Sequence, residues 1–167
     1  MGSGNIILIG MPGAGKSTVG VVLAKKLGFA FVDSDLVIQE KEGKLLHEII
    51  AERGVEGFWT VEEAVNVSIE ADRTVIATGG SAVYGSRAME HFRSIGMVVY
   101  LKLSLDAIAD RLGDLNERGV TLREGQNLIQ LYEERAPLYE KYANITIDCE
   151  HLSIREIVGQ IAQTVRI

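Results

Sequence analysis

Residues 10–17 read GMPGAGKS and place a lysine and a hydroxyl directly after a glycine-rich run. They match the pattern G-x-x-x-x-G-K-[ST], with the apolar stretch NIILIG before them and a segment of helical spacing after them. Because Gly13 and Gly15 carry no side chain, backbone N–H groups can close on phosphate oxygens there. The positive end of the following helix points at the same anion. The pattern therefore predicts a nucleoside triphosphate site, and we expect the nucleotide to be ATP.

The two polar side chains of this loop have separate tasks. Lys16 is predicted to reach the β- and γ-phosphates, and Ser17 is predicted to supply a hydroxyl to Mg²⁺. A glycine turn that only joins a strand to a helix needs neither side chain, so that interpretation is the weaker one. The residues expected to surround the nucleotide are Pro12, Gly13, Ala14, Gly15, Lys16, Ser17 and Thr18. The loop by itself leaves open which molecule receives the phosphate.

The magnesium ion also needs an acid near this loop. The expected strand TVIAT (74–78) ends in two glycines, whereas the strand FAFVD (29–33) runs into Asp33 and Asp35. Both acids would lie at the carboxyl edge of a parallel sheet, where ligands bind. We expect Asp33 to hold Mg²⁺ through a water, and Asp35 to accept a hydrogen bond and a proton from the acceptor hydroxyl. The alternative is that either acid merely caps the next helix.

Short apolar strands alternate with helices along the chain. Strands are expected at 5–10, 29–33, 74–78, 96–103 and 144–149. Helices are expected at 16–27, at 36–53 with a break near Gly43, at 56–71, 86–94, 105–112 and 153–166, and in a long segment that ends near 142 and is interrupted by Pro137. This alternation predicts a parallel sheet covered on both faces. Residues 113–127 are polar and without periodicity, which predicts a lid.

The composition narrows the classes of partner. The 167 residues suit a single domain, 1–167, and 47% of them are hydrophobic. A net charge of −6 argues against a nucleic-acid surface, and no apolar run is long enough to span a membrane. The single cysteine, Cys149, favours a reducing compartment, so we expect a cytoplasmic protein. We also expect a monomer whose partners are ATP and a small-molecule acceptor.

The order of motifs resembles the shikimate kinase family from about residue 5 to the end. The motifs are GMPGAGKST (10–18), DSD (33–35), GFWTVEE (57–63), GGSAV (79–83) and ERAPLYEKYA (134–143). The resemblance implies a P-loop NTPase of α/β class, with the three-layer fold of nucleoside monophosphate kinases and a five-stranded parallel sheet in the order 2-3-1-4-5. It also implies transfer of the γ-phosphate of ATP to the 3-hydroxyl of shikimate.

The same resemblance implies roles for particular residues. Asp35 would bind the hydroxyls of the acceptor, Gly79 and Gly80 would present backbone to it, and Arg135 would hold its carboxylate. Arg118, in the lid, would lie over the phosphates. Apart from the resemblance, Arg111, Arg118 and Arg123 crowd the lid, where an arginine can neutralise the transferred charge; the alternative is a solvated lid face. The acceptor-binding helical region would span about 34–71, and the loop 150–153 would contact adenine.

Three positions depart from the family pattern: Trp59, Ser81 and Gly119. The family has an arginine at the position of Trp59, so only Arg135 remains of the two arginines that grip the carboxylate. One interpretation is that Trp59 packs as core and that Arg53 or Arg123 replaces the missing arginine. The other is that the acceptor differs from shikimate and lies against the indole. We expect Trp59 to line the acceptor pocket opposite Asp35 and Arg135.

Glu62 and Glu63 begin an amphipathic stretch, so solvated helix charges are the first expectation. The alternative is that Glu62 orients Trp59 or an arginine that binds the acceptor. Three functions therefore stay open: a shikimate kinase, a related kinase with another hydroxyl-bearing acceptor, and a nucleotide-binding regulatory protein without kinase activity.

Overall fold

A single parallel sheet of five strands lies at the centre of the molecule, in the order β2-β3-β1-β4-β5. The computed structural model describes residues 4–112 and 125–165. The strands are β1 (Asn5–Ile9), β2 (Ala30–Asp33), β3 (Thr74–Ala77), β4 (Gly96–Lys102) and β5 (Ile145–Asp148). The helices are α1 (Lys16–Leu27), α2 (Ser34–Glu42), α3 (Leu46–Ser68), η1 (Ala82–Tyr84), α4 (Ser86–Ile95), α5 (Leu105–Arg111), α6 (Leu128–Tyr142) and α7 (Ile154–Val165). The predicted fold class and strand order are confirmed.

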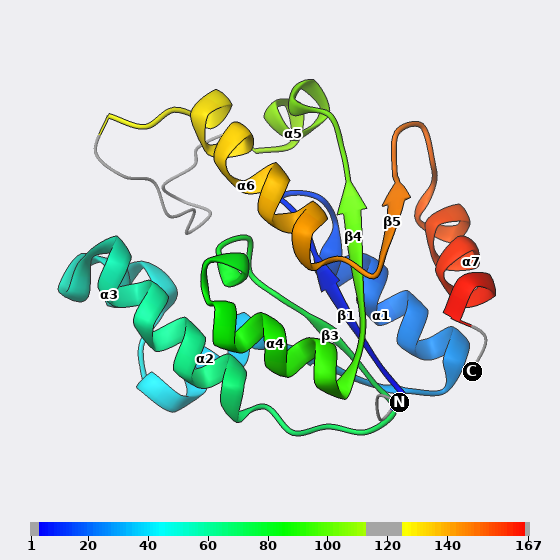
Figure 1. Cartoon of the computed structure of the whole chain (residues 1–167), viewed down its shortest axis with the longest axis horizontal. Coiled ribbons are helices and arrows are strands. Elements are labelled where there is room, and N and C mark those ends of the chain that lie inside the picture. Colours follow the sequence, from blue (N-terminus) through cyan, green and yellow to red (C-terminus); the bar gives the residue numbers. More distant parts are fainter. Residues whose placement is uncertain (1–3, 113–124, 166–167) are drawn as a thin grey trace.

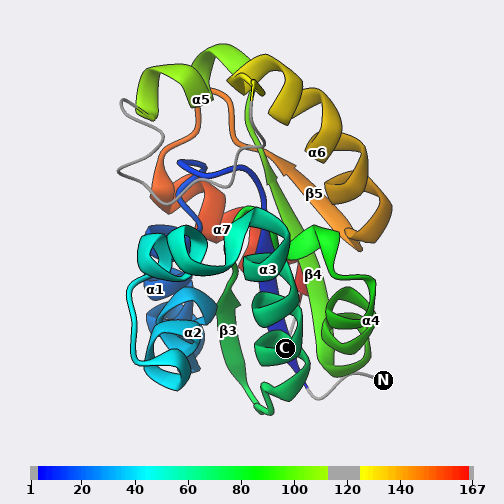
Figure 2. The same cartoon turned by 90° about the vertical axis from the view of Figure 1, so that its left-hand side faces the viewer.

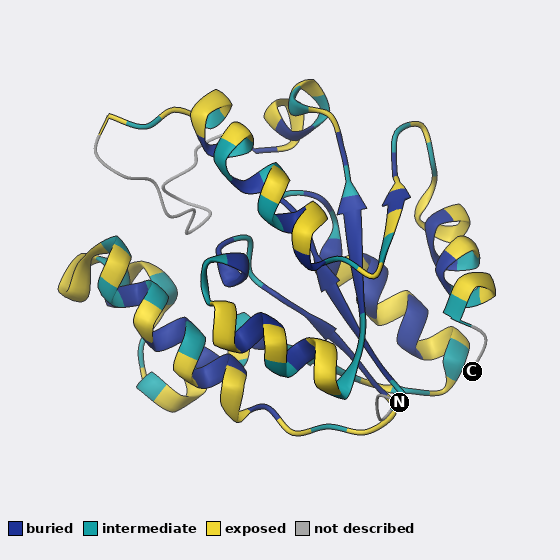
Figure 3. Ribbon diagram, viewed as in Figure 1, coloured by how far each residue is buried: buried dark blue, intermediate teal, exposed yellow. Residues whose placement is uncertain are grey.

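Helices cover both faces of this sheet and make a three-layer structure. Helices α1 and α7 lie side by side on one face, while α4 and α6 pack against β4 on the other (Figure 1). The quarter-turn view shows the strands running between these helical layers (Figure 2). Strand β1 is therefore buried along its whole length, which explains its unbroken apolar run (Figure 3). Among the described residues, no helix is long and apolar enough to cross a membrane.

The register of the strands brings distant parts of the sequence to one edge of the sheet. Asp33 at the end of β2 pairs with Ala77 at the end of β3, and Leu8 of β1 also pairs with Ala77. All of these pairings are parallel, so the segments that follow the three strands leave the sheet at the same edge. This edge therefore carries the glycine-rich loop, the start of α2 and the double glycine.

Helices α2 and α3 share a second, smaller core. It contains Ile38 of α2 and, on α3, Ile49, Phe58, Val61 and Val65. Gly54 has a φ of 76° and a ψ of 175°, which breaks α3 into two helical parts. The helix of GFWTVEE thus begins just after a glycine break, in agreement with the separate helices predicted before and after it.

One predicted interruption is absent. Helix α6 continues from Leu128 to Tyr142 with Pro137 inside it. A proline removes one backbone donor and crowds the carbonyl four residues earlier. Here the residues on both sides of it, Leu131, Arg135, Tyr139 and Tyr142, are buried. We infer that their packing offsets the lost hydrogen bond, and the prediction of an interrupted helix was wrong.

Candidate active site

A cavity of about 280 Å³ opens at the edge of the sheet where the three segments meet. Its described lining comes from the glycine-rich loop, from α2, α3 and α6, and from the segment after β3. The residues that line it are Pro12, Gly13, Gly15, Lys16, Ser17, Thr18, Asp35, Leu46, Phe58, Glu62, Thr78, Gly79, Gly80, Ser81, Leu112 and Arg135. Nearly all of the predicted loop residues and four of the five predicted acceptor residues, Asp35, Gly79, Gly80 and Arg135, are thus brought together.

The glycine-rich loop has the backbone that its sequence requires. Gly13 and Gly15 have φ values of 82° and 94°, in the region that favours glycine. Gly15 also caps α1, whose first residue is Lys16, so the positive end of α1 faces the cavity. Ala14 is buried in the main core, and its N–H donates to the Met11 carbonyl. Unlike the other predicted loop residues, Ala14 does not line the cavity.

Lys16 is held inside the loop. Its Nζ donates to the Gly10 carbonyl at 2.6 Å and to the Met11 carbonyl at 2.8 Å. Burial lowers the pKa of Lys16 to about 8, although the nearby Asp35 carboxylate acts in the opposite direction. The ammonium group is therefore poorly solvated, and it sits where a phosphate oxygen would be a better partner than a carbonyl.

Ser17 and Asp33 lie in direct contact. The Ser17 hydroxyl donates to Asp33 Oδ2 at 2.8 Å, while Asp33 Oδ1 accepts from the Asp35 N–H at 3.0 Å and caps α2. The helix-capping interpretation and the metal-site interpretation therefore use different oxygens of one carboxylate. A hydroxyl and a carboxylate oxygen beside a phosphate loop are the hard oxygen donors that Mg²⁺ prefers, so these residues fit the predicted ion.

Asp35 faces Glu62 across the double glycine. A Cβ placed on Gly79 would lie 2.6 Å from Asp35 Oδ1 and 3.1 Å from Glu62 Oε2. The position therefore needs a glycine, because a side chain there would displace a carboxylate. Burial raises the pKa of Asp35 to about 6, and the neighbouring Asp33 adds to this rise. A carboxylate of raised pKa is a stronger base than an exposed aspartate.

Glu62 is not a solvated helix charge. Its side chain is 2% exposed, and its Oε1 accepts a 2.7 Å hydrogen bond from the Ser81 hydroxyl. Burial raises the pKa of Glu62 to about 8, with the Ser81 hydrogen bond opposing the shift. The burial of Glu62 could have been predicted from the sequence, because Glu62 falls on the same helical face as Phe58 and Val65. The exposed-charge expectation was wrong for Glu62.

Glu63 is not among the described residues that line the cavity. It pairs with Arg87 at 3.6 Å and accepts from the Arg87 N–H at 3.2 Å. Its partner is the first turn of α4, so this contact joins α3 to α4.

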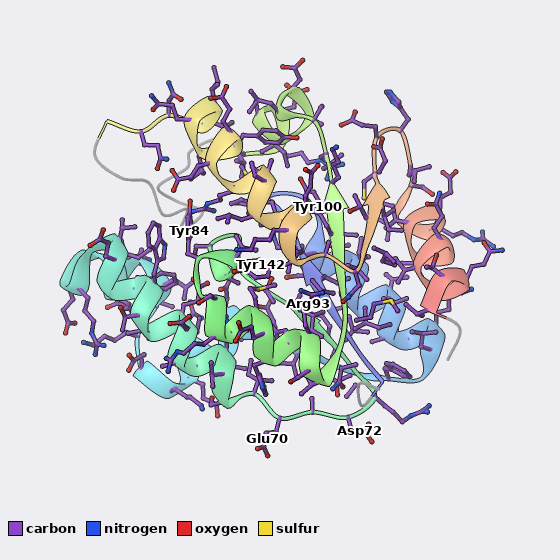
Figure 4. The ribbon with its side chains drawn as sticks, in the orientation of Figure 1. Glu70, Asp72, Tyr84, Arg93, Tyr100 and Tyr142 are labelled. Carbon is purple, nitrogen blue, oxygen red and sulfur yellow. The ribbon has the colours of Figure 1, made fainter. Side chains whose placement is uncertain are left out.

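Arg135 enters the cavity from α6 and is 1% exposed. Its Nη1 lies 3.0 Å from the place that a Cβ on Gly80 would take, so the guanidinium and the double glycine share one wall. Its Nε donates to the Tyr84 hydroxyl at 3.3 Å. Tyr84, labelled in Figure 4, lies between α3 and α6.

Trp59 is placed differently from the expectation. It is partly buried, packs against the smaller core, and stacks on Tyr84 with ring centroids 4.1 Å apart. Among the described residues that line the cavity, the neighbouring Phe58 is present and Trp59 is absent. Successive residues on a helix point about 100° apart, so with Phe58 at the cavity wall the indole of Trp59 is turned toward the ring of Tyr84. The expectation that Trp59 lines this cavity is therefore corrected.

The predicted arginines have different positions. Arg111 Nη1 donates to the Gly13 carbonyl at 3.1 Å, which places this side chain beside the glycine-rich loop. Arg53 pairs with Glu42 at 3.4 Å on the surface and is not among the described residues of the cavity wall. Arg118, Gly119 and Arg123 lie outside the described residues, as does most of the predicted lid, 113–127.

The predicted adenine loop joins β5 to α7. Glu150 Oε1 accepts from the Ser104 N–H at 2.6 Å, just before α5. Ser153 and Glu156 exchange hydrogen bonds of 3.1 Å at the start of α7, so the loop is fixed at both ends.

Comparison with known proteins shows that this chain is similar to shikimate kinases over nearly its whole length. Residues 12–166 match the family model of shikimate kinase. The shikimate kinase of Thermodesulfovibrio yellowstonii is 38% identical over 94% of this chain and 92% of that protein. The shikimate kinase of Sulfurihydrogenibium sp. is 34% identical over 97% of this chain and 98% of that protein. The structure of shikimate kinase from Acinetobacter baumannii in complex with shikimate matches with a TM-score of 0.83 and 32% identity, over 98% of this chain and 93% of that chain.

Proposed function

The chain belongs to the shikimate kinase family, and we infer that it transfers the γ-phosphate of ATP to shikimate, giving shikimate 3-phosphate and ADP. One observation of the site supports this most strongly: a single cavity joins the glycine-rich loop to Asp35 and Arg135. It therefore offers a phosphate site, a base and a carboxylate partner in one space. A shikimate molecule presents the matching hydroxyl and carboxylate.

The glycine-rich loop holds the phosphates and neutralises their charge. On nucleotide binding, Lys16 Nζ exchanges the carbonyls of Gly10 and Met11 for phosphate oxygens, and the first turn of α1 directs its N–H groups at the same anion. Positioning and charge neutralisation are the main sources of rate in phosphoryl transfer. Arg111, beside Gly13, adds positive charge at the phosphates, and the resemblance assigns Arg118 the same role.

Asp35 receives the proton of the acceptor hydroxyl. As the hydroxyl oxygen forms its bond to the γ-phosphorus, the bond to the bridging oxygen breaks and ADP leaves with that electron pair. Asp35 is partly buried at the cavity wall, and its raised pKa favours this proton transfer. Gly79 leaves room for the carboxylate at this point.

Ser17 and Asp33 would hold the magnesium ion of the ATP complex. The Ser17 hydroxyl already donates a 2.8 Å hydrogen bond to Asp33 Oδ2 beside the glycine-rich loop. When bound, Mg²⁺ neutralises phosphate charge and orients the phosphate chain. The protein itself keeps Asp33 in place by using its second oxygen to cap α2.

Arg135 binds the carboxylate of the acceptor. It is buried in the cavity wall beside Gly80, and a guanidinium recognises a carboxylate by paired, charge-assisted hydrogen bonds. We further propose a cytoplasmic protein, which the single cysteine supports, and a monomer as its working form.

The test is ADP release with shikimate, measured for the wild type, Asp35→Asn and Asp72→Asn. Asp35→Asn should lower kcat by at least about 100-fold, because a general base contributes that much, with little change in KM for ATP. Asp72 is exposed at the far end of the molecule (Figure 4), so Asp72→Asn should keep wild-type rates. A wild-type kcat in Asp35→Asn would contradict the mechanism. A wild type that turns over no compound in a panel of hydroxy acids and polyols would favour the regulatory alternative.

A further inference from the structure

Tyr84 connects three elements at the acceptor end of the cavity. It ends η1, the short helix that follows the double glycine and Ser81. Its ring stacks on Trp59 of α3 with centroids 4.1 Å apart and planes 20° apart. The Arg135 guanidinium carbon of α6 lies 5.3 Å from the centroid of the same ring. One phenol ring therefore contacts both the indole and the arginine.

The hydroxyl of Tyr84 adds a directional contact. It accepts from Arg135 Nε at 3.3 Å and donates to Glu134 Oε1 at 2.9 Å. Glu134 is fixed in turn, because its Oε2 accepts from Gln126 Nε2 at 2.8 Å. A hydroxyl between a cation and an anion has its donor and acceptor directions both determined. The hydroxyl therefore orients the Nε–H of Arg135, while the ring of Tyr84 lies close to the same guanidinium.

We propose that Trp59 and Tyr84 form an aromatic support that fixes the plane of the Arg135 guanidinium for the acceptor carboxylate, with Tyr84 as a positioning residue. The proposal rests on the proposed function. Trp59 is absent from the cavity wall that the described residues form, and its ring stacks on Tyr84, so in this proposal it acts through Tyr84. A guanidinium held in its binding orientation loses less freedom when it binds, which strengthens each hydrogen bond to the carboxylate.

This arrangement gives Trp59 a role in a site where Arg135 is the only arginine among the described residues of the cavity wall. An indole has only one N–H donor and cannot form a paired contact with a carboxylate. An indole does offer a large, rigid face on which a phenol ring can stack. The site then recognises the carboxylate with one preorganised arginine, where the resembled family uses two.

The kinetic test compares variants that keep or remove each contact. Tyr84→Leu removes the ring and the hydroxyl, and it should raise KM for shikimate by about tenfold, as expected when a charge-assisted hydrogen bond is weakened. KM for ATP and KM for the methyl ester of shikimate should stay within about twofold, because neither depends on a fixed carboxylate partner. Trp59→Leu should have the same pattern with a smaller change, and Trp59→Phe, which keeps an aromatic ring, should restore KM.

Tyr132→Phe is a matched control for Tyr84→Phe. Tyr132 is on α6, the helix of Arg135, and its hydroxyl donates to the Leu103 carbonyl at 2.8 Å, so each variant loses one tyrosine hydroxyl that makes hydrogen bonds. Tyr84→Phe should raise KM for shikimate, and Tyr132→Phe should not. A loss of kcat or of melting temperature in Tyr84→Leu, without a selective rise in KM for shikimate, would show a structural role only and overturn the proposal.

A measurement without substrate separates this proposal from the proposed function. In ¹⁵N-labelled protein, the Arg135 Nε–H signal is assigned by its loss in Arg135→Lys. It should exchange slowly with water in the wild type and in Trp59→Phe, and it should exchange faster in Tyr84→Leu. Equal exchange in the wild type and Tyr84→Leu would contradict the support even if shikimate is turned over. Faster exchange in Tyr84→Leu would uphold the support even if shikimate is not the acceptor.

Discussion

The Ser81 hydroxyl donates a 2.7 Å hydrogen bond to Glu62 Oε1 in the interior, where both residues are buried. The resembled family has a third glycine at the position of Ser81. A glycine has no hydroxyl, so it could not make this hydrogen bond. The second oxygen of Glu62 lies beside Gly79 and makes no hydrogen bond among the described residues. The pair therefore joins α3 to the segment after β3 through a carboxyl group whose pKa burial raises to about 8.

Glu62→Gln should change how stability depends on pH. Burial raises the pKa of Glu62 from 4.5 to about 8, so its stabilising contribution is complete below about 4.5 and is lost as pH rises through 8. The neutral amide has no such loss. The free energy of unfolding of Glu62→Gln relative to the wild type should therefore increase between pH 5 and pH 8. Urea denaturation at several pH values measures it.

The charged neighbours of Glu62 are the same in both proteins. They are Asp35, Arg135 and Lys16, of which Asp35 disfavours the glutamate charge and the other two favour it. Their own titrations appear in both curves, so the difference between the curves isolates Glu62. Parallel curves from pH 5 to pH 8 would mean that Glu62 titrates as an ordinary exposed carboxylate. Glu40→Gln, at an exposed glutamate of α2, is the matched control.

Lys16→Ala should abolish turnover and leave the fold intact. The ammonium group provides charge at the transferred phosphate, and a methyl group cannot replace it. The lost hydrogen bonds are to two loop carbonyls, and removal of a poorly solvated charge offsets part of that cost. Turnover and far-UV circular dichroism are measured on the same preparation. Wild-type turnover in this variant would exclude the proposed role of the loop.

Gly79→Ala should lower kcat, whereas Gly159→Ala should stabilise the fold. A Cβ on Gly79 would come within 2.6 Å of Asp35 Oδ1, so the base must move and kcat should fall. Gly159 lies within α7 with no atom within 4 Å of such a Cβ, so alanine should stabilise the helix by about 0.5–1 kcal/mol. Steady-state kinetics and thermal melts compare the two. Equal kcat values would show that the glycine is not needed to place Asp35.

Shikimate should change the fluorescence of Trp59. It is the only tryptophan of the chain, and its ring stacks on Tyr84, which contacts Arg135. A carboxylate bound to Arg135 alters the charge next to this stack, so the emission intensity or maximum should shift on titration. The shift should be absent in Arg135→Lys if that variant no longer binds the acceptor. An unchanged spectrum at saturating shikimate would mean that Trp59 does not sense the acceptor site.

Local chemistry explains what was predictable from the sequence. The glycine-rich loop is contiguous, and its function needs only backbone N–H groups, one lysine and one hydroxyl, so residues 10–17 sufficed to predict it. The strands were recognisable because a sheet covered on both faces requires short, continuous apolar runs. The strand order came from the resemblance, and the register then explains why the segments that follow Asp33 and Ala77 leave the sheet at the same edge as the loop.

The three-dimensional structure alone decided which side chains meet inside the acceptor end. Glu62 lies next to Ser81 although 19 residues separate them, and Trp59 stacks on Tyr84 although its neighbour Phe58 takes the cavity wall. Periodicity identifies the buried face of a helix, but it does not give the angle at which that helix meets its neighbours. That angle decides whether the buried Glu62 lies within hydrogen-bond distance of the Ser81 hydroxyl. It also decides whether the indole of Trp59 faces the substrate or the ring of Tyr84. The sequence therefore determined the phosphate chemistry, and the packing of α3 against η1 and α6 determined how the acceptor site is built.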